Sequence, residues 1–175
     1  MRSSSPRLAR DLGAVPFYTG DTYDLRRSLG FLLRQNGRMA IRLGEAAFAD
    51  AGVSFTHWLS LFLLRKHMVA TVGDLGRCLG FSSGAVTRLV DQLEKRDLVA
   101  RSRSATDRRV MGIALTADGS DMADALLPRL LTMWNTVLAD FGHQEAHALI
   151  GSLSRLAGVL RERLDQDDPL PFVDI

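Results

Sequence analysis

The stretch SSGAVTRLVDQLEKR, residues 82–96, decides the fold that this sequence predicts. Apolar residues recur along it at the i, i+3, i+4 and i+7 spacing of a single helix face. They are Val86, Leu89, Val90 and Leu93. Ser82 is a favourable N-cap, so the sequence predicts an amphipathic helix that ends near residue 96. The opposite face of this helix carries small and polar side chains, which are Ser83, Gly84, Thr87, Arg88 and Asp91.

A shorter helix is predicted just before this one. Thr71 and Asp74 have the spacing of a capping box, although Asp stands where Glu or Gln is preferred. Gly80 is suited to end the short helix, and Phe81 leads into the next. Two short helices joined by a tight turn, with a small polar face early in the second, are typical of a helix-turn-helix. In that motif the second helix enters the major groove of DNA.

Two short strands are predicted after the second helix. Residues 98–103 and 110–115 have the residue pattern of strands, and the polar residues 104–109 between them indicate a hairpin turn. A hairpin directly after a helix-turn-helix is typical of a wing, whose arginine side chains can enter the minor groove of DNA. A solvated hairpin with surface charge is the alternative. The order helix, helix, hairpin favours the wing.

The charge of the chain is unevenly distributed, although its formal net value is only +2. Residues 1–42 carry a net charge of +5 and residues 77–109 a net charge of +4, whereas residues 110–175 carry −6. A basic middle and an acidic C-terminal third suggest that one part of the protein faces a polyanion. Hydrophobic residues make up 46% of the chain, which predicts a packed core and excludes wholesale disorder.

We expect a cytoplasmic protein that does not span a membrane. The longest apolar stretch, residues 58–64, is too short to cross a bilayer, and residues 1–16 lack the apolar block of a secretory signal. The single cysteine, Cys78, excludes an internal disulfide and a site built from several thiolates. A reducing compartment fits this cysteine usage.

Taken together, these motifs resemble the MarR family of winged-helix transcription regulators. The residues that carry the resemblance are Ser83-Gly84-Ala85-Val86-Thr87-Arg88-Leu89-Val90-Asp91 with Leu93-Glu94-Lys95-Arg96, then Asp107-Arg108-Arg109, and Leu115-Thr116-Ala117-Asp118-Gly119. The core match covers residues 71–119, and the flanking helices extend it to residues 24–164. Asp97 stands where the family usually has glycine, which implies a stiffer or differently hydrogen-bonded turn.

The resemblance implies a mainly α fold with a small β-hairpin wing, in which a winged helix-turn-helix is flanked by dimerisation helices. Apolar helical patterns in residues 24–50, 116–138 and 143–164 support these helices independently. A single winged helix is too small to cover them, so a partner subunit is expected. The expected organisation is an N-terminal arm (1–22), a dimerisation helix (23–52), the DNA-binding domain (53–115), two C-terminal dimerisation helices (116–164) and an acidic tail (165–175).

The resemblance also implies which side chains meet DNA. The recognition-helix positions that face DNA correspond to Ser82, Ser83, Thr87 and Arg88. Arg109 matches the wing arginine that approaches the minor groove, and Asp107 matches an aspartate that orients the wing. Arg108 and Arg77 are candidates for phosphate contacts. An ordinary exposed charge is an equally good interpretation of Arg77.

The function implied by the resemblance is that of a homodimer bound to a pseudo-palindromic operator in double-stranded DNA. Family members commonly act as repressors that a small, often aromatic effector releases from DNA. Four residues are candidates for lining an effector pocket, with core packing as the default for the tryptophan; they are Trp58, His57, Arg34 and Arg38. The sequence does not identify the effector, and no cofactor is expected.

Several alternatives compete with this interpretation. His143 and His147 are four residues apart and are weak candidates for zinc ligands, so a zinc-responsive regulator of the same fold stays open. A winged helix that binds only proteins would have a poorly basic wing, against which Arg108 and Arg109 argue. Cys78 falls on an apolar helix face, whereas the sensing cysteines of the family sit near the first helix, so packing is expected. Enzymatic activity is not expected, because no phosphate-binding loop or nucleophile motif appears.

Overall fold

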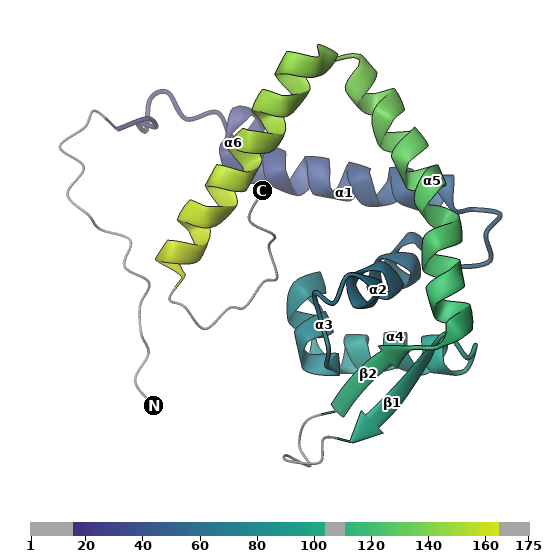
Figure 1. Ribbon diagram of the computed structural model, residues 1–175. Helices are drawn as coiled ribbons and strands as arrows, with labels where there is room; N and C mark the ends of the chain where they lie inside the picture. The colour runs from purple at the N-terminus through teal and green to yellow at the C-terminus, as the bar shows by residue number, and fades with distance from the viewer. Residues whose placement is uncertain (1–15, 104–110, 165–175) are drawn as a thin grey trace, which may run out of the picture.

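The computed structural model describes residues 16–103 and 111–164 as a mainly helical chain with one β-hairpin (Figure 1). The helices are α1 (Leu29–Ala47), α2 (Phe55–Arg65), α3 (Val72–Leu79), α4 (Ser83–Glu94), α5 (Ala117–Ala139) and α6 (Gly142–Arg163), with a 3-10 turn, η1 (Leu25–Arg27), before α1. The strands β1 (Val99–Arg103) and β2 (Met111–Leu115) pair in antiparallel orientation. The predicted fold class is therefore confirmed. No helix in the described part of the chain combines the length and apolar character needed to cross a membrane.

The first long helix begins later than the sequence predicts. The expected helix starts at Asp24, but the Asp24 carboxylate accepts the backbone N–H of Arg26 at 2.9 Å and begins the turn η1 instead. Ser28 has extended backbone angles, so the regular helix begins only at Leu29. The Tyr18 hydroxyl accepts the N–H of Leu29 at 2.9 Å. This contact satisfies one of the N–H groups that a helix start leaves without a partner.

The helix-turn-helix forms where its capping residues predict it. The Thr71 hydroxyl accepts the N–H of Asp74 at 3.0 Å, and the Asp74 carboxylate accepts the N–H of Thr71 at 3.1 Å, which completes the capping box. Gly80 ends α3 in the left-handed conformation, with φ of 67°. Ser82 stands at the N-cap of α4, but its hydroxyl accepts no helix N–H. Ser82 therefore has the position of a cap without its usual hydrogen bond.

The core is centred on Trp58 of α2. This side chain is fully buried and stacks on Phe48 and Phe62 at centroid distances of 5.2 and 5.0 Å. Its indole N–H donates to the carbonyl oxygen of Ala123 in α5 at 3.0 Å. The apolar face predicted for α4 is confirmed, because all four of its residues are buried in the same core. That packing leaves the polar face of α4 at the molecular surface.

The hairpin has a fixed register and a third partner that the sequence does not reveal. Val99 pairs with Leu115 at the base, and Arg103 pairs with Met111 at the outer end. The segment before α3 adds an isolated bridge to β2, and the N–H of Ile113 donates to the carbonyl oxygen of Ala70 at 2.9 Å. The middle of β2 is therefore held by backbone hydrogen bonds on both sides.

The turn between α4 and β1 depends on the residue that departs from the family pattern. Asp97 has a φ of 56°, in the left-handed region that favours glycine. Its carbonyl oxygen accepts the hydroxyl of Thr116 at 2.6 Å, which joins this turn to the start of α5. This conformation explains why glycine suits the position.

Asp97→Gly is expected to raise the free energy of unfolding by about 0.5–1 kcal/mol, because glycine adopts a positive φ without the steric cost of a Cβ. Urea unfolding followed by circular dichroism measures the change. Asp97→Ala is the matched control, since it keeps the Cβ and should give no gain. An equal gain in both variants would contradict the steric explanation.

Helices α1 and α6 extend away from the core. No residue of α6 within the described chain is buried, and Gly44 alone is buried in α1. Figure 1 shows α5 and α6 meeting at the end of the molecule opposite α4. The exposed large apolar residues of α1, α5 and α6 are called the apolar helix surface. They are Leu29, Leu32, Leu33, Met39, Ile41, Leu43, Leu131, Trp134, Leu149, Ile150, Leu153, Val159 and Leu160. Soluble monomers rarely expose so many large apolar side chains together on a few helices.

Candidate nucleic-acid interface

The start of α4 presents small and polar side chains to solvent. We call this set the recognition face; it comprises Ser82, Ser83, Gly84, Thr87 and Arg88, all of which are exposed. The Thr87 hydroxyl donates to the carbonyl oxygen of Ser83 at 2.7 Å and keeps its oxygen free to accept a further hydrogen bond. Arg88 has no hydrogen bond or ion pair with any residue that the structure describes. Its guanidinium is therefore available to an external partner.

The recognition face has the shape that a groove-binding helix needs. Small residues near the start of a helix let its backbone approach the base edges of a major groove. No heavy atom beyond the local backbone lies within 4 Å of a Cβ built on Gly84, so the surface there is open. Figure 1 shows α4 and the hairpin at the same end of the molecule. One duplex can therefore meet both elements at once.

Arg77, the phosphate candidate on α3, already has a partner. Its guanidinium Nη2 lies 2.5 Å from Asp74 Oδ1, and Asp74 also accepts the N–H of Thr71 in the capping box. The Arg77 side chain is 46% exposed. A phosphate would share this guanidinium with a carboxylate, so both interpretations of Arg77 from the sequence stay predictions.

The tip of the wing lies outside the described residues. Asp107, Arg108 and Arg109 fall within the interval 104–110, so their predicted roles toward DNA stay predictions. The described strands end at Arg103 and Met111, which face each other in the ladder. Arg103 and Met111 therefore lie next to each other.

Sequence reasoning missed Arg101, which joins the wing to the recognition helix. From β1 its guanidinium contacts Asp91 Oδ1 at 2.6 Å and Glu94 Oε2 at 2.7 Å, both on α4. It also donates to the backbone carbonyl oxygen of Thr87 at 3.3 Å. The sequence signal that could have revealed this contact is a pair of carboxylates three residues apart on a helix, followed by an arginine on the next strand.

The four candidates for an effector pocket have different surroundings. Trp58 is a fully buried core residue whose indole N–H is satisfied, so it packs the core rather than lining a ligand pocket. His57 is tied to neighbouring side chains, with Nδ1 2.7 Å from Ser54 Oγ and Nε2 2.9 Å from Gln92 Oε1. Arg34 and Arg38 are exposed on α1. The core-packing alternative for Trp58 is the one that fits the structure.

The two weak zinc candidates lie side by side near the α5–α6 turn. The rings of His143 and His147 are 6.2 Å apart between centroids, and both residues are exposed. They line a cavity of about 660 Å³ whose other walls are mostly apolar. Within the described residues, no third His, Cys, Asp or Glu joins them to make a metal-binding group. Two imidazoles alone fall short of the three or four ligands of a zinc site.

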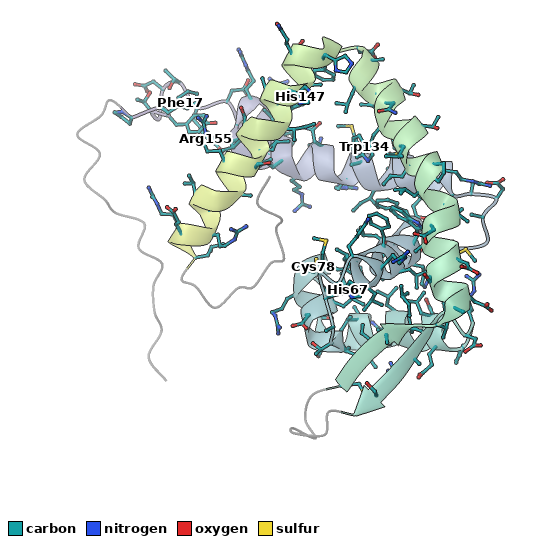
Figure 2. All side chains as sticks on the ribbon, viewed as in Figure 1. Phe17, His67, Cys78, Trp134, His147 and Arg155 are labelled. Carbon is teal, nitrogen blue, oxygen red and sulfur yellow. The ribbon has the colours of Figure 1, made fainter. Side chains whose placement is uncertain are left out.

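Cys78 has the environment of a packing residue. It is half-buried on α3 and packs against the core, as the sequence predicts (Figure 2). Burial raises the pKa of the Cys78 thiol above its ordinary value, so the thiol stays protonated at neutral pH. Because the thiolate is the reactive form, this environment disfavours oxidation sensing.

The fold and the exposed face of α4 define a winged helix-turn-helix protein. The model of the MarR family matches residues 51–110. The organic hydroperoxide resistance transcriptional regulator of Bacillus subtilis is 31% identical over 100 residues, which span 57% of this chain and 68% of that relative. The HTH-type transcriptional regulator YcgE of the same species is 29% identical over 144 residues, or 82% of this chain and 93% of that relative. The chain belongs to the MarR family of DNA-binding transcription regulators.

Solved structures share the same fold. A probable transcriptional regulator from Pseudomonas aeruginosa is 28% identical, with a TM-score of 0.65 over 76% of this chain and 99% of that one. A MarR mutant from E. coli complexed with operator DNA is 20% identical, with a TM-score of 0.67 over 77% and 99%. Bordetella bronchiseptica BpsR, whose DNA binding is regulated by 6-hydroxynicotinic acid, is 19% identical, with a TM-score of 0.66 over 77% and 96%. The last two comparisons show the fold alone.

Proposed function

We propose that this protein is a sequence-specific repressor of transcription that inserts α4 into the major groove of its operator, with the wing over the adjacent minor groove. The observation that carries the proposal is the recognition face, where Arg88 and Thr87 are exposed and able to bind an external partner. A guanidinium and a hydroxyl suit base edges and phosphates. The structural neighbour that is bound to operator DNA supports the same use of the fold. It follows from this proposal that the protein is a regulator rather than an enzyme. It also follows that the protein acts in the cytoplasm.

We further propose that the protein acts as a homodimer. The apolar helix surface supports this, because a second copy of the same helices would cover it and remove apolar area from water. Two recognition helices related by a two-fold axis would enter successive major grooves about 34 Å apart. The operator is then a pseudo-palindrome with half-sites one helical turn apart.

Light scattering at micromolar concentration is expected to give twice the chain mass of 19.3 kDa. Leu153→Glu should shift the protein toward monomer, because it places a charge on the exposed apolar face of α6. Leu153→Met keeps the apolar character and the approximate volume, so this control should stay dimeric. A wild-type protein that remains monomeric at this concentration would remove the two-half-site model.

A small molecule is proposed to release the protein from DNA. The support is the structural neighbour whose DNA binding responds to 6-hydroxynicotinic acid. The chemical class to screen first is therefore small aromatic acids. Each compound would be added to a preformed complex of protein and labelled duplex, and release would appear as a fall in fluorescence anisotropy. Zinc, added in a separate series, tests the metal-responsive alternative.

The function is tested by selecting bound duplexes from a random pool. We expect enrichment of one motif with two inverted half-sites whose centres lie about ten base pairs apart. A pool without enrichment, from folded protein, would contradict sequence-specific binding and favour a winged helix that binds only other proteins.

A further inference from the structure

The wing hairpin is attached to the rest of the domain in two different ways. On its outer side, β2 is held by backbone hydrogen bonding to the segment before α3, through the N–H of Ile113 and the carbonyl oxygen of Ala70. On its inner side, β1 follows α4 through the turn at Asp97, and Val99 is buried at its base. Farther out along β1, Arg101 makes the only side-chain hydrogen bonds and ion pairs that join the described part of the hairpin to α4.

The guanidinium of Arg101 is placed to hold one side of α4. Asp91 and Glu94 are three residues apart, and Thr87 is one turn before Asp91, so all three acceptors lie along the side of α4 that faces β1. Arg101 Nη1 reaches Glu94 at 2.7 Å, and Nη2 reaches Asp91 at 2.6 Å and the carbonyl oxygen of Thr87 at 3.3 Å. The planar guanidinium of arginine spreads its donors widely enough to bridge such acceptors at once, whereas the compact ammonium of lysine is less suited to this geometry.

The contact at Thr87 connects this cluster to the recognition face. Thr87 and Arg88 expose their side chains at the surface, and the backbone carbonyl of Thr87 accepts a hydrogen bond from Arg101. The Arg101 side chain is only 22% exposed, and its guanidinium faces two carboxylates. It is therefore committed to α4 and unavailable to DNA.

We propose that Arg101 is a positioning residue that fixes the wing hairpin relative to α4, so that both elements fit the operator at the same time. The inference rests on the proposed DNA-binding function and adds to it a residue that does not touch DNA. Asp91 and Glu94 are its partners. The two carboxylates thereby favour operator binding, although their charge repels phosphates.

The carboxylates provide the decisive test, because two explanations predict opposite changes in operator affinity when their charges are removed. If charge alone mattered, the double variant Asp91→Asn, Glu94→Gln would bind DNA more tightly, since it removes negative charge close to phosphates. If the carboxylates serve to hold Arg101, the same variant should bind the selected operator about tenfold more weakly. Its affinity for random-sequence duplex should stay equal or rise.

Arg101→Met should also weaken operator binding about tenfold, and combining it with the double variant should add no further loss, because one interaction is removed in both. Arg101→Lys should fall between Arg101→Met and wild type. Arg65→Met is the control, since Arg65 pairs with Asp124 between α2 and α5 at 3.1 Å, and neither residue lies on α4 or the hairpin. Thermal melting of each variant confirms that it is folded.

A measurement without DNA separates this inference from the proposed function. In the free protein, backbone amides of β1 and β2 should exchange with deuterium about tenfold faster in Arg101→Met than in wild type, while Arg65→Met leaves them unchanged. Unchanged hairpin exchange, or operator binding by the double variant as tight as wild type, would overturn the inference. If exchange is faster in Arg101→Met but the wild-type protein selects no operator, the inference that Arg101 holds the wing stands and only the proposed function is contradicted.

Discussion

Gly119→Ala is expected to lower the free energy of unfolding by about 3 kcal/mol or more, because an added Cβ at Gly119 would make the shortest contact among the described glycines. Gly119 is buried in the first turn of α5, where a Cβ would lie 1.9 Å from the carbonyl oxygen of Leu98. That oxygen belongs to the backbone and accepts the N–H of Thr116 at 3.3 Å, so it cannot move aside as a side chain would. The start of α5 and the base of β1 must therefore separate.

Gly73→Ala is the matched control for this prediction. Gly73 also lies in the first turn of a helix, α3, but a Cβ there would meet only side-chain atoms, the nearest at 3.5 Å. The same chemical change should therefore be neutral or should stabilise by up to about 1 kcal/mol. Urea unfolding of both variants gives the comparison. Similar stability for Gly119→Ala and wild type would show that α5 does not approach β1 as closely as described.

Arg88→Ala is expected to weaken operator binding by about 1–3 kcal/mol while leaving the fold and the dimer unchanged. The side chain is exposed on the recognition face and has no partner among the described residues, so its removal costs little in the free protein. In the complex it would reach a base edge or a phosphate. A titration by fluorescence anisotropy at several salt concentrations measures both the affinity and its dependence on salt.

The matched control removes an equal charge from the far end of the molecule. Arg155 is exposed on α6, away from α4 and the hairpin (Figure 2). Arg155→Ala should change operator affinity much less than Arg88→Ala does, because Arg155 lies far from the recognition face. Equal losses in the two variants would indicate that net charge, rather than the recognition face, governs binding.

Much of the DNA-binding domain could be predicted because its signals are local. The capping box at Thr71 and Asp74 and the stop at Gly80 depend on residues within one turn of each other, and the apolar face of α4 follows from its spacing alone. The signals that predict the hairpin are equally local, because the two strand patterns and the polar turn follow one another in residues 98–115. These elements are what a MarR-family protein needs to present α4, and the family resemblance implies which side of it is expected to face DNA.

The remaining features depend on contacts between distant segments, which a single sequence does not specify. The bridge from Thr71 to Gly112 joins residues from different elements, and so does the ion pairing of Arg101 with α4. Trp58 was a pocket candidate because its residue type suits a ligand, yet the aromatic side chains stacked on it make it the centre of the core. The start of α1 was misplaced because an aspartate caps a short turn as readily as a helix.

Site-directed DNA cleavage tests the central claim most directly. An iron chelate attached to Ser83→Cys, in protein whose Cys78 is replaced by alanine, would place the cleaving group on the recognition face. An equivalent Ser154→Cys protein places it on the exposed surface of α6. We expect cleavage from Ser83→Cys inside both half-sites of the selected operator and none from Ser154→Cys. Absence of cleavage from Ser83→Cys in a protein that still binds the operator would show that α4 does not enter the groove.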